Sequence, residues 1–120
     1  MTREERPPLL ARALLQELHE QMGTEATAAF VRNYISMWDS RYARLETACL
    51  EDDAAAAMDV VLSIKTASHM AGAARLSALA STAQHHLGSY DVAAVSAMLG
   101  SFRSCGAETM LSLAARTGCP

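Results

Sequence analysis

Aromatic residues are scarce in this chain: Trp, Tyr and Phe together make up 5% of its 120 residues. The 6 glycines and 3 prolines are also few, so there are few positions where a helix has to stop. No apolar run approaches the length of about 18 residues that a membrane-spanning helix needs. The 10 Lys and Arg residues are outnumbered by 13 Asp and Glu. We therefore expect neither a membrane segment nor a nucleic-acid partner, because nucleic acid is bound through clustered basic side chains.

The three cysteines, Cys49, Cys105 and Cys119, are odd in number and lie far apart. This pattern favours reduced thiols in a cytoplasmic protein over a disulfide framework, and no spacing among the cysteines resembles a zinc site. Residues 1–8 contain no apolar run of the kind that a signal peptide carries. We expect one cytoplasmic domain over residues 1–120 that holds no metal and no cofactor.

Alanine and other apolar residues dominate what is present, and 51% of the chain is hydrophobic. Since alanine is the strongest helix former, the composition predicts an all-α fold. Gly23 is expected to end a short first helix that has Pro7 and Pro8 in its first turn. Gly100 and Gly106 weaken the predicted continuity of the last helix. Helices are expected at residues 7–22, 24–50, 51–71, 73–87 and 89–116, with a turn at the acidic residues 51–53 where the third begins and with Ser89 or Asp91 as the cap of the last. Short connections make neighbours antiparallel, so we predict an up-down four-helix bundle with a short extra N-terminal helix.

The third of these helices has two contrasting faces at helical spacing. One face is small or apolar and is predicted to point into the core; it carries Ala57, Val61, Ile64, Ser68 and Ala71. The opposite face mixes apolar and polar groups; it carries Met58, Leu62, Lys65, Thr66 and His69. An outward leucine beside an outward methionine makes this second face a candidate surface for binding a partner.

The stretch LSIKTASHMAGAARL, residues 62–76, resembles the signature of the histidine phosphotransfer (HPt) family. The family pattern is His-x-Leu-Lys-Gly-Ser-Ser, three residues, then Gly-Ala-x-x-Leu. The matching positions are Ile64 in place of the Leu, Lys65, Ser68, Gly72, Ala73 and Leu76. The resemblance implies a four-helix bundle whose partner is the receiver domain of a response regulator or a histidine kinase.

Two departures from the family pattern concern its chemistry. Leu62 occupies the position of the phosphoaccepting histidine, and a leucine side chain has no nucleophilic nitrogen. Thr66 replaces the glycine that, in the family, lets a receiver approach closely. We therefore interpret the chain as a docking or inhibitory module that carries no phosphate. Met58 and Leu62 would be its apolar contacts and Lys65 its polar anchor, with Thr66 and His69 beside them.

Two alternatives remain open. His69 lies seven residues after Leu62 on the same face but about 10 Å further along the axis, so only a shifted partner could use it as a phosphoacceptor. The other alternative is a bundle outside signalling that self-associates through Met58 and Leu62. The adjacent His85 and His86 point about 100° apart and do not predict a two-histidine metal face. No phosphate-binding loop, nucleophile elbow or paired-carboxylate motif predicts an enzyme.

Overall fold

The computed structural model describes residues 7–117, with side chains placed up to residue 116. Within this part of the chain all regular structure is helical and there is no strand, which confirms the all-α prediction. The helices are α1 (Arg12–Leu50), α2 (Ala54–Met70), α3 (Ala74–Leu87), α4 (Val92–Ala97) and α5 (Leu99–Thr117). None of these described helices is at once long and apolar enough to span a membrane. The expectations for residues 1–6 and for Cys119 lie outside the described residues.

Helix α1 is interrupted at Gly23, as the sequence predicts. The backbone there has φ 83° and ψ 170°, far from helical values, so α1 consists of a first segment before Gly23 and a longer one after it. The first segment begins at Arg12, so the prediction that Pro7 and Pro8 lie in its first turn is wrong. The reason is tertiary: the Pro7 carbonyl accepts a hydrogen bond of 3.1 Å from Arg75 Nε, which holds the chain outside the helix against α3.

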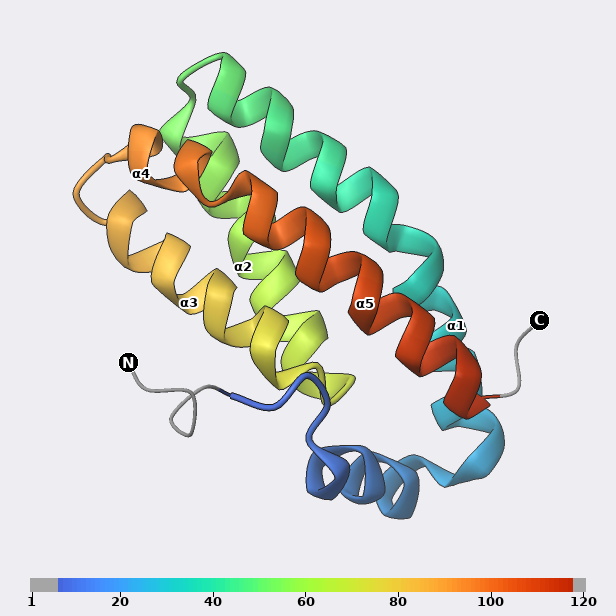
Figure 1. The fold of residues 1–120 in the computed structure, drawn as a ribbon. Coiled ribbons are helices and arrows are strands. Elements are labelled where there is room, and N and C mark those ends of the chain that lie inside the picture. The colour runs from blue at the N-terminus through green and yellow to red at the C-terminus, as the bar shows by residue number, and fades with distance from the viewer. Residues whose placement is uncertain (1–6, 118–120) are drawn as a thin grey trace.

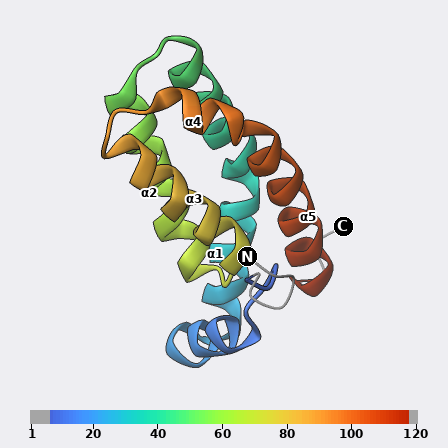
Figure 2. The ribbon, with the colours of Figure 1, turned by 60° about the vertical axis from the view of Figure 1, so that its left-hand side comes forward.

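The first segment of α1 lies across the turn between α2 and α3 (Figures 1 and 2). The backbone N–H of Ala11 donates a 2.7 Å hydrogen bond to the carbonyl of Gly72 in that turn. Gly72 has φ 73°, and a Cβ built on it would lie 2.8 Å from Leu15 Cγ. A glycine is therefore needed here both for its left-handed backbone and for the space that the first segment occupies.

The last predicted helix is divided into two, which corrects the expectation of one helix to residue 116. Met98 interrupts it: its N–H bonds to the carbonyl of Val95, three residues back, instead of four. Neither Gly100 nor Gly106 lies at the break, since both fall inside α5. Val92 and Val95 of α4 are buried against α3 and α1, and the chain has to turn after them to run along α1.

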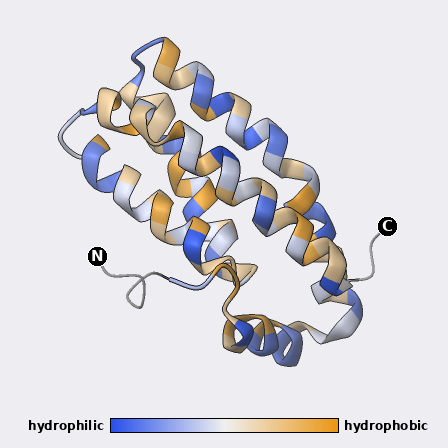
Figure 3. Ribbon diagram, in the orientation of Figure 1, coloured by the Kyte–Doolittle hydropathy of each residue, from blue (hydrophilic) through white to orange (hydrophobic). Residues whose placement is uncertain are grey.

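The longer segment of α1 packs against α2 on one side and α5 on the other, and α3 packs against both α2 and α5. Helices α2 and α5 therefore lie diagonally opposite each other, as Figures 1 and 2 show. The largest fully buried side chains come from all four of these helices; they include Leu45, Ile64, Leu76, Phe102 and Leu113. Apolar and polar positions alternate along each helix (Figure 3), as expected when one side faces a shared core.

Candidate docking face on helix α2

Helix α2 is oriented about its own axis as its sequence predicts. The five positions assigned to the core are at most 1% exposed; they are Ala57, Val61, Ile64, Ser68 and Ala71, which directly follows the helix. On the opposite side Leu62 is 40% exposed, Thr66 and His69 are exposed, and Met58 and Lys65 are half-buried. The structure therefore brings the five predicted site residues onto one stripe, with Leu62 at its middle. We call this stripe the α2 face.

Asp53 fixes where α2 begins. Its side chain accepts a 3.0 Å hydrogen bond from the backbone N–H of Ala56 and so occupies one of the unpaired donors of the first turn. This geometry agrees with the predicted turn at the acidic residues before the helix.

A buried hydrogen bond ties the core side of α2 to α1. Tyr34 Oη and Ser68 Oγ lie 2.6 Å apart, and both side chains are at most 3% exposed. Sequence reasoning placed Ser68 in the core but did not identify Tyr34 as its partner. The signal was present, because a hydroxyl on a core-facing position needs a hydrogen-bonding partner.

Burial raises the pKa of Tyr34 from 10.0 to about 12, against the smaller lowering effects of the Ser68 hydrogen bond and of Arg41. Below pH 10 the phenol is protonated in both the folded and the unfolded chain. Between pH 10 and 12 the unfolded chain loses this proton while the folded chain keeps it, so unfolding becomes more favourable. We expect a loss on the order of 3 kcal/mol in the free energy of unfolding over this range.

Denaturant titrations at a series of pH values, on the original chain and on Tyr34→Phe, measure this loss. The variant has no phenol at this position, so its stability should fall less steeply above pH 10. Equal slopes would show that Tyr34 keeps its ordinary pKa in the folded state.

The amine of Lys65 is held on the α3 side of the α2 face. Lys65 Nζ donates a 2.8 Å hydrogen bond to Oε1 of Gln84, and its backbone carbonyl accepts one of 3.4 Å from Ser77 Oγ. An ammonium group has three donors, so two remain for another acceptor. Lys65 is therefore positioned by α3 on the α2 face, although sequence reasoning did not identify Gln84 as its partner.

Two arginines of α1 border the α2 face on the other side. Arg41 Nε donates a 3.2 Å hydrogen bond to Ser63 Oγ, and the exposed Arg44 forms an ion pair of 3.4 Å with Asp59. Neither arginine was predicted, because both are brought to α2 by the packing of α1. Cationic groups therefore lie on both sides of the α2 face, Lys65 on the α3 side and the two arginines on the α1 side, in a chain whose net charge is −3.

His69 lies at the end of α2, away from the centre of the face. It lines a hollow of 200 Å³ together with its neighbour Met70 and the first segment of α1, which contributes Leu14, Glu17, Leu18 and Gln21. The carboxylate of Glu17 in this hollow would repel a phosphoryl group on His69. As an alternative phosphoacceptor, His69 would need a partner that docks at this end of α2 and not over Leu62.

The remaining candidate groups in the described part of the chain are two histidines and two cysteines. The rings of His85 and His86 have centroids 6.0 Å apart at 61°, and no three His, Cys, Asp or Glu side chains within the described residues could hold a metal ion. Cys49 and Cys105 are both buried cysteines. Cys105 Sγ lies 3.9 Å from Thr109 Oγ1 within the core.

Comparison of this chain with family models, with curated proteins and with solved structures finds no match. The resemblance to the HPt signature therefore rests on the sequence of residues 62–76.

Proposed function

We propose that this chain is an HPt-like signalling module that binds a receiver domain or a histidine kinase through the α2 face without carrying phosphate. Its architecture would be an up-down four-helix bundle, with the first segment of α1 as the extra N-terminal helix. One observation carries the proposal. Leu62, at the position of the family's phosphoacceptor, is 40% exposed at the centre of a helix face whose opposite side is fully buried.

The burial of the motif residues supports a module that shares the family's fold but does not transfer phosphate. The matched positions other than Lys65 are all buried; they are Ile64, Ser68, Gly72, Ala73 and Leu76. The two departures from the pattern, Leu62 and Thr66, both point outward. The residues that pack the bundle thus resemble the family, whereas on the outward side Lys65 matches and Leu62 and Thr66 do not.

The charges around Leu62 favour an acidic partner surface with an apolar centre. Lys65 lies on the α3 side of the exposed leucine, and Arg41 and Arg44 lie on the α1 side. A partner would therefore bury the leucine and supply acceptors to the cations at the rim. Such binding would weaken as salt concentration rises.

We expect the original chain to gain no phosphohistidine when it is incubated with phosphorylated receiver domains from the same genome. The physical reason is that Leu62, which occupies the phosphoacceptor position of the motif, has no nitrogen that could accept the phosphoryl group. The matched variant is Leu62→His combined with Thr66→Gly, which supplies an imidazole beside Lys65 and Gln84 and opens the space of the missing glycine. This variant should become phosphorylated by at least one of those receivers.

Phosphopeptide mass spectrometry and acid lability measure both results. Phosphate on His69 of the original chain, lost in His69→Ala, would replace the proposal with the alternative of an active phosphotransfer protein. Failure of every receiver both to bind the original chain and to phosphorylate the variant would remove the receiver as the partner. A dimer that dissociates in Leu62→Asp, without receiver or kinase binding, would favour self-association through Met58 and Leu62.

A further inference from the structure

A groove of 640 Å³ runs between α1 and α5, on a different side of the molecule from the α2 face. Trp38, which is only 7% exposed, is one of the residues that line it. Gly106 of α5 sets how closely the two helices approach, because a Cβ at this position would overlap the Trp38 ring. The contact also fixes which residues of α1 and α5 lie at the same level along the groove.

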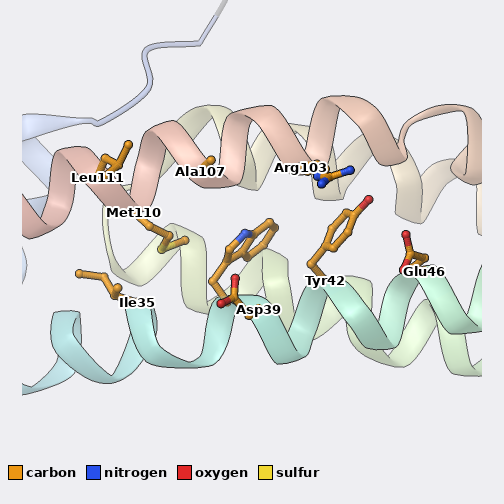
Figure 4. Close-up of a pocket in the computed structure, with 9 residues that line it drawn as sticks. Ile35, Asp39, Tyr42, Glu46, Arg103, Ala107, Met110 and Leu111 are labelled. Atoms are coloured by element: carbon orange, nitrogen blue, oxygen red, sulfur yellow. The ribbon is translucent and has the colours of Figure 1, made fainter.

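The groove has an apolar end and a polar end (Figure 4). At the apolar end Ile35 of α1 lies at the level of Met110 and Leu111 of α5. Leu111 is 73% exposed, which is a large apolar surface for one side chain to leave in water. At the polar end Tyr42 rises from α1 toward Arg103 of α5.

The two walls of the groove carry opposite charges. The α1 wall has the carboxylates of Asp39 and Glu46, and the α5 wall has the guanidinium of Arg103. The level of Arg103 falls between those of the two carboxylates (Figure 4). In the described part of the chain none of these three groups forms an ion pair within 4.0 Å. The groove therefore presents an acidic wall and a basic wall whose charges are not paired with each other.

We propose that this groove binds a second copy of the chain, about a two-fold axis that runs parallel to α1 and α5. Such an axis leaves each residue at its own level along the groove and moves it to the opposite wall. It would lay α5 of one copy over α1 of the other. Leu111 would then cover Ile35 of the second copy, and Arg103 would face the two carboxylates.

The charges on the walls favour this axis over the other two-fold axis that could bring the two grooves face to face. An axis across the groove would place α1 on α1, with carboxylates against carboxylates, and would separate the apolar ends from each other. With the axis along the helices, every contact occurs twice and is favourable both times, which is the requirement for a closed symmetric dimer. The proposal does not depend on the function proposed for the α2 face.

The experiment uses two charge-reversed proteins, each purified alone and then mixed. The first is Arg103→Glu, which has two acidic walls. The second is Asp39→Lys combined with Glu46→Lys, which has two basic walls. Sedimentation velocity should find the original chain dimeric, and each variant alone should have its dimer dissociation constant raised at least about tenfold.

An equal mixture of the two variants should form a heterodimer, detected by native mass spectrometry. In that pair each acidic wall meets a basic wall at both symmetry-related contacts. A rearrangement within one chain cannot produce this complementation, because each variant alone has like charges on both walls. The same assembly also shows that both variants are folded.

Leu111→Glu should weaken the original dimer at the apolar end, and Leu62→Asp should leave it unchanged. A chain that is monomeric at every concentration would overturn the proposal, and so would a mixture that forms no heterodimer. A dimer that is lost in Leu62→Asp and kept in Leu111→Glu would also overturn it, because that result assigns the interface to the α2 face. A small molecule that copurifies in the groove of a monomeric chain would identify a different occupant.

Discussion

Leu62→Asp is expected to abolish binding to the receiver domain or kinase and to lower the free energy of unfolding by only about 1 kcal/mol. A partner that covers Leu62 gains up to roughly 1.5–3 kcal/mol by removing a leucine side chain from water. An aspartate at the same place forfeits this gain and leaves an uncompensated charge in the interface. The cost to the free chain is small because Leu62 is 40% exposed and makes no buried polar contact.

The matched control is Ile64→Asp, two residues further along α2 and on the opposite side of the helix. Ile64 is 1% exposed, so its replacement would bury a carboxylate in the core and should cost about 4–5 kcal/mol or more. We expect this variant to be unfolded or aggregated at room temperature. Circular dichroism during urea unfolding measures the stability of both variants, and isothermal titration calorimetry measures partner binding.

Two results would contradict this expectation in different ways. If Leu62→Asp unfolds and Ile64→Asp is tolerated, the orientation of α2 is wrong and the match with the HPt motif is lost with it. If Leu62→Asp stays folded and binds the partner as well as the original chain does, the orientation stands and the α2 face is not the docking surface.

The orientation and the ends of α2 could be predicted from the sequence because their causes are local. The spacing of Val61, Ile64 and Ser68 follows the helical period, and each is buried. Asp53 caps the first turn through its own side chain, and Gly72 stops the chain with a left-handed backbone. Each of these causes acts within a few residues of the feature it determines.

The polar contacts that shape the α2 face could not be predicted because they join distant parts of the chain. Gln84 reaches Lys65 across 19 residues and Arg41 reaches Ser63 across 22, so their pairing depends on how α3 and α1 pack against α2. The break at Met98 has a similar origin. Gly100 and Gly106 were the predicted weak points of the last helix. The helix is instead interrupted at Met98, directly after α4, whose valines Val92 and Val95 are buried.

The contact between Gly106 and Trp38 is another feature that only the packed structure reveals, and it leads to the second large effect. Gly106→Ala should lower the free energy of unfolding by about 1–3 kcal/mol, because the added methyl group overlaps the Trp38 ring and forces α1 and α5 apart. The higher helix propensity of alanine, worth about 1 kcal/mol, offsets only part of this cost.

Gly100→Ala is the matched control on the same helix. Apart from the adjoining backbone of its own helix, a Cβ at Gly100 would meet no atom within 4 Å, so only the gain in helix propensity remains. This variant should be stabilised by about 0.5–1 kcal/mol. The opposite signs of the two effects separate the packing of α5 against α1 from the intrinsic preference of α5 for helix.

Tryptophan fluorescence during denaturant unfolding gives both measurements, since Trp38 is the only tryptophan of the chain. In Gly106→Ala the emission of the folded protein should shift to longer wavelength as the indole moves toward the groove, whereas Gly100→Ala should keep the original spectrum. Because the displaced ring would narrow the groove, Gly106→Ala should also weaken the dimer proposed there. If both variants gain stability and keep the original emission, then α5 lies further from α1 than the Trp38 contact requires, and the shape of the groove has to be revised with it.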